Sequence, residues 1–155
     1  DVILLGEMRD YETINIAMTA AETGHLLFST LHTIGAANTI DRIIDVYPPH
    51  SQGQIRSQLA NSVVGIISQT LVPTADGKGR CAALEILAAT DAIRSMIREG
   101  KIFQIPTAIA TGKKNGMFTL DQDLARLVNM GKITNEVALT KCQDPNEYRR
   151  YLSVV

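Results

Sequence analysis

Two short apolar runs stand near the beginning of the chain, and each gives way to a cluster of polar residues. Residues 2–5 read Val-Ile-Leu-Leu with no polar face, and residues 25–31 are apolar in their middle. An unbroken apolar run is typical of a strand covered on both sides, which usually belongs to a parallel sheet. Between the runs, residues 12–22 carry apolar or small residues at helical spacing: Ile14, Ala17, Met18 and Ala21. The pattern therefore predicts a strand-helix-strand unit whose two polar clusters lie side by side at one edge of the sheet.

The remaining pattern predicts helices around a single hairpin. Periodic apolar positions and capping residues favour helices over 36–45, 53–68, 91–99, 102–111, 119–130, 136–140 and from 145 onward. Strands are expected over 68–72 and 80–87, because the turn Asp76-Gly77-Lys78-Gly79 between them supplies positive φ angles. We expect this hairpin to extend the edge of the parallel sheet. Since no strand is expected after residue 89, we place a boundary between an α/β core (1–89) and a helical appendage (90–155).

Composition and charge limit the possible functions. Hydrophobic residues make up 45% of the 155 residues, which is ample for one core, and no apolar run approaches the ~18 residues of a membrane-spanning helix. The 15 basic and 16 acidic residues give a formal net charge of −1, which argues against a general nucleic-acid or anionic-membrane surface. Cys81 and Cys142 lack CxxC spacing and are expected to be free thiols. The start Asp1-Val2 has neither an initiator Met nor a signal peptide, so we expect a piece of a longer chain.

Candidate chemistry collects in the polar clusters that follow the two strands. Glu7 and Arg9 stand at the carboxyl end of the first strand, where ligands of open α/β sheets bind. A carboxylate there can orient a water or hold Mg²⁺ through water, and a guanidinium can stabilise transferred phosphate. The alternative is a simple ion pair between the two side chains. His25 and His32 begin and end the second strand, about 20 Å apart along an extended chain, so a shared zinc site is not expected.

Three further arginines are candidates for surface or coupling roles. Arg42 lies on a predicted helix beside Asp41 and Asp45, which favours a surface salt bridge. Arg94 and Arg98 are four residues apart and so share one helical face. The simplest interpretation of that pair is a solvated basic face.

Three motifs resemble those of one protein family. Residues 6–10, Gly-Glu-Met-Arg-Asp, resemble the Walker B box of the type II/type IV secretion ATPases, and residues 23–33, Thr-Gly-His-Leu-Leu-Phe-Ser-Thr-Leu-His-Thr, resemble their His box. Residues 92–99, Ala-Ile-Arg-Ser-Met-Ile-Arg-Glu, are similar to the Ala-Ile-Arg-Asn-Leu-Ile-Arg-Glu signature of the branch that retracts type IV pili, with Ser95 and Met96 as departures. The motifs come in family order at family spacing, and the resemblance extends to about Tyr151.

The resemblance implies a fold and a function for the parent protein. The fold would be the C-terminal part of a RecA-like P-loop NTPase core, with a mostly parallel sheet and an antiparallel hairpin, followed by a helical appendage. The parent would be a cytoplasmic, Mg²⁺-dependent ATPase whose hexameric ring drives pilus retraction and twitching motility. It would work at the inner face of the bacterial inner membrane with a pilus platform protein, without inserting into the membrane or binding nucleic acid.

The resemblance also implies roles for individual residues. Glu7 would activate water, Arg9 and His32 would sense or stabilise phosphate, and His25 and Thr30 would help to bind the nucleotide. ATP would bring Mg²⁺, which would be held through nucleotide and water near Glu7 and not by direct protein ligands. A coupling segment would transmit motion through Ala92, Ile93, Arg94, Ile97, Arg98 and Glu99.

The sequence lacks a GxxxxGK[ST] phosphate-binding loop. Residues 77–80 and 112–115 are the nearest candidates, and both miss the first Gly and the hydroxyl. We therefore expect the hydrolysis half of a nucleotide site without its binding half, and a chain that is inactive alone. Two alternatives remain open. One is a pilus-assembly or type II secretion ATPase of the same superfamily, which commonly carries a four-cysteine zinc motif absent here. The other is a non-catalytic module that docks on a pilus motor ring.

Overall fold

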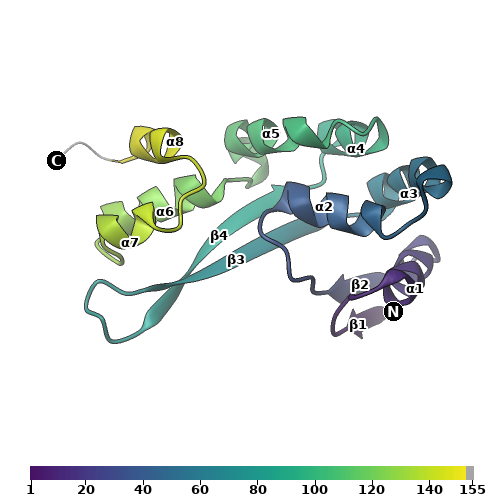
Figure 1. Ribbon diagram of the computed structural model, residues 1–155, viewed down its shortest axis with the longest axis horizontal. Coiled ribbons are helices and arrows are strands. Elements are labelled where there is room, and N and C mark those ends of the chain that lie inside the picture. The colour runs from purple at the N-terminus through teal and green to yellow at the C-terminus, as the bar shows by residue number, and fades with distance from the viewer. Residues whose placement is uncertain (153–155) are drawn as a thin grey trace. The chain divides into compact units, whose positions relative to one another are not determined.

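The computed structural model describes residues 1–152, which fall into two compact units. The first unit comprises residues 1–65 and 88–105, and the second comprises residues 66–87 and the chain from 106 onward (Figure 1). The boundary that the sequence suggests between residues 89 and 90 concerns the domains of a parent protein, and it stays a prediction. Within residues 1–152, the helices are too short or too polar to cross a membrane.

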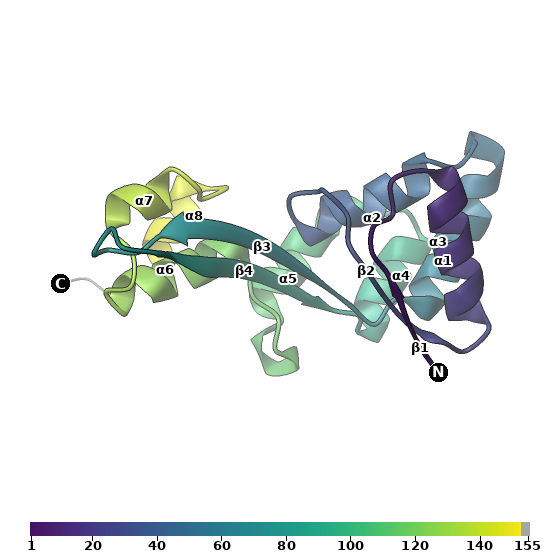
Figure 2. The ribbon, with the colours of Figure 1, turned by 90° about the horizontal axis from the view of Figure 1, so that it is seen from below.

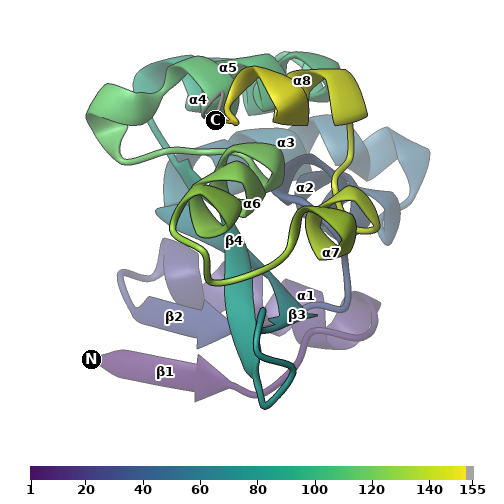
Figure 3. The ribbon, with the colours of Figure 1, turned by 90° about the vertical axis from the view of Figure 1, so that its left-hand side faces the viewer.

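A strand-helix-strand unit opens the chain, as the sequence predicts. β1 (Val2–Leu5) and β2 (Leu26–Ser29) pair in parallel, with the first residue of β1 opposite the first residue of β2 (Figure 3). α1 (Tyr11–Glu22) connects them and buries Ile14, Ala17 and Met18. A parallel pair requires such a crossover, because the chain must return to the same end of the sheet before the second strand begins.

The two strands are covered on one face only. Side chains alternate between the faces of a strand, so Ile3 and Leu27 share a half-buried face. On the other face Leu4 is 79% exposed and Phe28 is 56% exposed. The expectation of strands buried on both faces is therefore wrong for the described residues, because the described elements cover this two-stranded sheet from one side alone.

Helices complete the first unit. They are α2 (Ala36–Asp45), α3 (Pro49–Ser62), α4 (Asp91–Arg98) and the short 3-10 turn η1 (Ile102–Gln104). α3 packs against α1, α2 and α4, and its position beside α1 is clear in Figure 2. The predicted range 53–68 for α3 is wrong at both ends. Pro49 starts the helix because a proline in the first turn has no N–H to leave unpaired, and Val63 ends it with an extended backbone.

A hairpin opens the second unit. β3 (Gly65–Pro73) and β4 (Arg80–Ala88) pair with each other, and Gly77 takes the positive φ of 68° that the turn needs. The prediction that this hairpin extends the parallel sheet is wrong, since the two strand pairs form separate sheets in the described residues. β4 finds its further backbone partner elsewhere: Ile86 and Phe118 exchange hydrogen bonds of 3.0 and 3.3 Å as an isolated antiparallel bridge.

Short capped helices follow the hairpin. They are α5 (Ile105–Thr111), the 3-10 turn η2 (Lys113–Asn115), α6 (Leu120–Asn129), α7 (Asn135–Leu139) and α8 (Pro145–Arg150). A capping box starts α6, because the Thr119 and Gln122 side chains each accept the other residue's backbone N–H. A core cluster forms between the hairpin and these helices, with these buried members: Val72, Ala83, Leu120, Leu124, Ala125, Leu127, Ile133, Ala138 and Tyr148.

Two buried carboxylates of α6 tie the second unit together. The Asp123 side chain accepts the Leu84 N–H of β4 at 2.8 Å and pairs with the Arg126 guanidinium at 2.7 Å. Asp121 accepts the N–H groups of Gln143 and Asp144, at 2.7 and 2.8 Å, and so fixes the connection into α8. A buried carboxylate is stable only when such donors satisfy it. The pair with Arg126 is local to α6, whereas the contacts with Leu84, Gln143 and Asp144 join segments far apart in the sequence, and nothing in the local pattern predicts them.

We predict that Asp123→Asn destabilises the protein by about 2 kcal/mol. The carboxamide has one acceptor oxygen where the carboxylate has two, and it loses the charge that faces Arg126. Urea-induced unfolding followed by circular dichroism measures the change. The matched control is Asp45→Asn, at an exposed position at the end of α2, which should change the free energy of unfolding little. Equal effects of the two substitutions would contradict the assigned role of Asp123.

Candidate functional site

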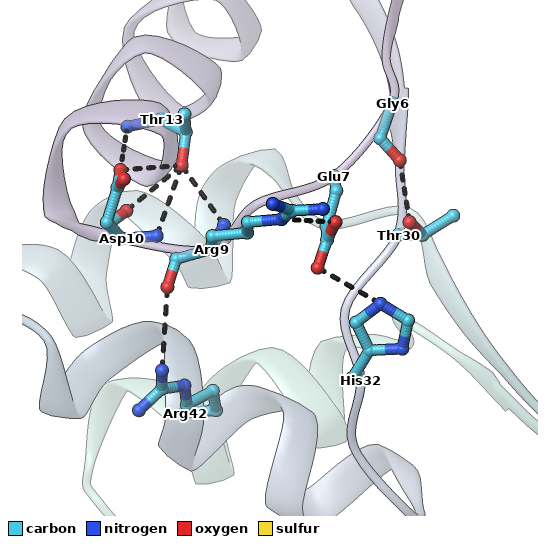
Figure 4. Close-up of polar contacts among 8 residues, drawn as sticks. All are labelled: Gly6, Glu7, Arg9, Asp10, Thr13, Thr30, His32 and Arg42. Atoms are coloured by element: carbon cyan, nitrogen blue, oxygen red, sulfur yellow. Dashed lines mark hydrogen bonds and ion pairs between the residues drawn. The ribbon is translucent and has the colours of Figure 1, made fainter.

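The carboxyl ends of β1 and β2 are fastened to each other beyond the last paired residues. The Met8 N–H donates to the Thr30 carbonyl at 2.9 Å. The Thr30 hydroxyl donates to the Gly6 carbonyl at 2.6 Å, as Figure 4 shows. One of these hydrogen bonds joins two backbone groups, and the other starts from a side chain. Together they continue the contact between the strands past the last paired residues. The polar clusters after the two strands consequently lie side by side, as the parallel arrangement predicts.

Glu7 lies between the other two candidate catalytic residues. Its Oε2 is 2.5 Å from Arg9 Nε, and its Oε1 is 3.0 Å from His32 Nε2 (Figure 4). The Glu7 side chain is 22% exposed, whereas those of Arg9 and His32 are 76% and 85% exposed. The Glu7 side chain is thus mostly shielded from solvent, while its two partners extend into it. The simple ion pair with Arg9, the alternative interpretation of Glu7, is present as well.

The arrangement can act on a phosphoryl group and its attacking water. A carboxylate can accept a proton from water, and cationic or N–H donors can stabilise charge on phosphate oxygens. Because Arg9 and His32 are mostly exposed, their donors can turn from Glu7 toward a bound anion without exposing buried surface.

A capping box fixes the segment after Glu7. The Asp10 side chain accepts the Thr13 N–H at 2.9 Å, while the Thr13 hydroxyl oxygen accepts the N–H groups of Arg9 and Asp10 at 3.2 and 3.3 Å. The Thr13 N–H, followed by the Thr13 hydroxyl, holds the pKa of the Asp10 carboxyl below its usual value. We did not predict this box. The signal was an Asp followed three residues later by Thr, just before the apolar face of α1.

His25 lies at the other end of β2 from this cluster. Its Nδ1 is 3.2 Å from both the Ala20 carbonyl oxygen and the Thr23 hydroxyl, so the ring contacts the last turn of α1. The structure therefore does not bring His25 to Glu7, and the contacts that it shows for this ring are structural. No group of three or more metal-ligating side chains occurs among residues 1–152.

Arg42 contacts the site through the backbone. The expected salt bridge with Asp41 or Asp45 is not present in the described part of the chain, and the guanidinium Nη2 instead lies 3.5 Å from the Arg9 carbonyl oxygen (Figure 4). The expectation was wrong because Arg42 reaches toward the loop before α1, a neighbour that only the folded chain provides. Its contact is long for a hydrogen bond, and it orients the loop weakly.

The sequence of the chain matches a known family and known relatives. The pattern of the family described as "Type II/IV secretion system protein" matches residues 1–140. The chain is 54% identical over 144 residues to a "Twitching motility protein" of Neisseria gonorrhoeae, covering 93% of this chain and 38% of the relative. It is 52% identical over 148 residues to the "Type IV pilus retractation ATPase PilT" of Pseudomonas aeruginosa, covering 96% of this chain and 43% of the relative.

The chain belongs to the type II/IV secretion system protein family.

A solved structure supports the same assignment. The crystal structure of "the Pilus Retraction Motor PilT and Bound ADP" aligns with 97% of this chain and 42% of its own, at 45% identity and a TM-score of 0.87. The resemblance expected from the three motifs is confirmed, and so is the fold class, the C-terminal part of a RecA-like core with a parallel strand pair, a hairpin and further helices. The chain spans about two fifths of the length of the curated relatives described above.

The segment that resembles the family's retraction signature forms α4. Ile93 and Ile97 are fully buried, whereas Ala92 and Arg98 are exposed. The expectation that Arg94 and Arg98 share one solvated basic face is wrong, because Arg94 is half-buried and donates to three backbone carbonyls. Beyond the helix, the Lys101 ammonium lies 2.6 Å from Glu99 and, with the Ser95 hydroxyl, holds the pKa of that carboxyl below its usual value.

We predict that Thr30→Val lowers the free energy of unfolding by about 1 kcal/mol. The substitution preserves the shape of the side chain and removes the hydroxyl that donates to Gly6. Thr30→Ser keeps the hydroxyl and should retain most of the stability. Urea-induced unfolding of the three proteins provides the measurement. If Thr30→Val were as stable as the natural chain, the hydrogen bond would not be holding the two strand ends together.

Proposed function

We propose that this chain is the hydrolysis and coupling part of an ATPase that drives type IV pilus retraction. The observation that carries the proposal is the position of Glu7, which lies between Arg9 and His32 at the carboxyl end of a parallel strand pair. Ligands of open α/β sheets bind at that edge. The relatives named for twitching motility and for pilus retraction, at 54% and 52% identity, support pilus retraction as the process that the ATPase would drive.

In the proposed reaction Glu7 activates the water that attacks the terminal phosphate. Arg9 and His32 turn from the carboxylate toward the phosphate oxygens as charge develops on them. Thr30 keeps the two strand ends together and can contact the nucleotide from there. His25 supports the site from a distance by holding the end of α1, and a nucleotide contact of its own is the secondary possibility.

The nucleotide would be ATP with Mg²⁺. The donor set fits this arrangement, since the cluster offers one carboxylate and would hold the ion only through nucleotide and water. Mg²⁺ usually keeps several waters and relies on substrate phosphates, so a single carboxylate is sufficient. Because the 155 residues contain no GxxxxGK[ST] loop, another stretch of polypeptide would grip the phosphates. A retraction motor of similar structure is described with bound ADP.

The parent protein would be a hexameric ring in the cytoplasm, at the inner face of the inner membrane, working with a pilus platform protein. A pilus-assembly or secretion ATPase of the same family is the second candidate, since it would share Glu7 and the His box. The retraction signature over residues 92–99 favours the first candidate. A docking module without catalysis is the third candidate, and the contact of Glu7 with both Arg9 and His32 speaks against it.

We predict that Glu7→Gln in the full-length parent lowers the rate of ATP hydrolysis by on the order of 10²-fold or more and leaves ATP binding nearly unchanged. Glutamine keeps the size of the side chain but cannot accept the water's proton. Steady-state hydrolysis and equilibrium binding of MgATP together make the measurement. The matched control is Glu12→Gln, an exposed glutamate in the first turn of α1, which should hydrolyse normally. Full activity of Glu7→Gln would contradict the proposal.

We also predict that the isolated chain, residues 1–155, does not bind MgATP with a Kd below about 1 μM. The reason is the missing phosphate-binding loop, without which backbone amides cannot wrap the phosphates. Isothermal titration calorimetry of the chain measures the binding, with the full-length parent as the positive control. Submicromolar binding to the isolated chain would show that the residues described here grip the nucleotide by themselves.

A further inference from the structure

Arg94 leaves the signature helix α4 and reaches the end of another helix. Its Nη1 donates to the carbonyl oxygen of Ala60 at 2.5 Å and to that of Asn61 at 3.1 Å. Its Nε donates to the carbonyl oxygen of Ala89 at 3.1 Å. One half-buried guanidinium thus joins the last turn of α3 to Ala89, two residues before α4 begins. Arg98, one turn later on the same helix, is exposed.

The α3 carbonyls to which Arg94 donates have no helical N–H partner of their own. α3 ends at Ser62, and Val63 turns away with a ψ of 132°. The carbonyls of Ala60 and Asn61 would otherwise bond to N–H groups four residues later, which the extended chain cannot present. These oxygens also carry the partial negative charge of a helix C-terminus, which favours a cation. Arg94 therefore satisfies a need that the early end of α3 creates.

The same place is the root of the β3–β4 hairpin. β3 begins at Gly65, shortly after α3 ends, and β4 ends at Ala88, directly before Ala89. The Ala89 N–H donates to the Val64 carbonyl at 3.0 Å and so closes the hairpin at its base. Arg94 donates to a carbonyl on each side of this closing bond. One belongs to Asn61, three residues before Val64, and the other belongs to Ala89 itself.

We propose that Arg94 is a positioning residue that fixes the root of the hairpin to α4. Arg98 stays exposed one turn later, so the two arginines of the signature differ in their surroundings. The inference rests on the proposed function, because it assigns a task within the coupling segment. A lysine cannot replace Arg94 fully, since a single ammonium cannot donate in the two directions that Nε and Nη1 cover.

The experiment uses the full-length parent protein with three substitutions: Arg94→Ala, Arg94→Lys and, as the matched control, Arg98→Ala. Hydrogen exchange followed by mass spectrometry measures the protection of residues 60–65 and 88–91. Arg94→Ala should raise the exchange rate of both segments by at least about tenfold, Arg94→Lys should lie in between, and Arg98→Ala should leave it unchanged. If Arg94→Ala does not fold, the comparison of Arg94→Lys with Arg98→Ala decides the question alone.

A second readout separates positioning from stability. The ratio of twitching speed to ATP hydrolysis rate measures coupling, and it should fall several-fold in Arg94→Ala and less in Arg94→Lys. Unchanged protection at the hairpin root, or an unchanged ratio in an active motor, would overturn the role of Arg94. A parent protein that hydrolyses no ATP would overturn the proposed function and its coupling, while the exchange data would still show whether Arg94 holds the root.

Discussion

The fastening of two parallel strand ends is the constraint on which the rest of the site depends. The Met8 N–H and the Thr30 hydroxyl hold the ends of β1 and β2 against each other, at 2.9 and 2.6 Å from their acceptors. With those ends joined, Glu7 and His32 can meet although 24 residues lie between them. Without the joint, each would be an isolated polar residue at the end of a short strand. The chemistry of the cluster is therefore a consequence of strand pairing.

The start of α1 holds the loop that carries Glu7 from its other end. The capping box of Asp10 and Thr13 orders the backbone that follows Glu7, so the short loop is anchored at the strand on one side and at α1 on the other. Hydrogen bonds hold the loop backbone at both ends, while the Arg9 and His32 side chains are exposed. Such a combination suits a site that must hold a carboxylate still and let its partners move to a phosphate.

The segment proposed to couple hydrolysis to motion, residues 92–99, contains residues in different surroundings. Ile93 and Ile97 pack in the core of the first unit, and Arg94 completes the end of α3 with its guanidinium. Arg98 keeps its charge in solvent. A substitution in this segment would therefore act through different physical causes: a cavity at the buried isoleucines, a loosened helix end at Arg94 or a lost surface charge at Arg98. The structure separates these causes, although in the sequence the residues stand side by side.

The sequence by itself determined the features that depend on near neighbours. Local periodicity predicts the strand-helix-strand unit, and capping residues predict the starts of α4, α6, α7 and α8. The geometry of a parallel crossover predicts that the two polar clusters meet. The tertiary structure alone decided the early end of α3, the separate hairpin sheet, the buried contacts of Asp123 and the inward turn of Arg94. Each of these is a hydrogen bond, or the lack of one, between segments distant in the chain. Residue type tells how many such bonds a group can make, but only the fold tells which partner comes within reach.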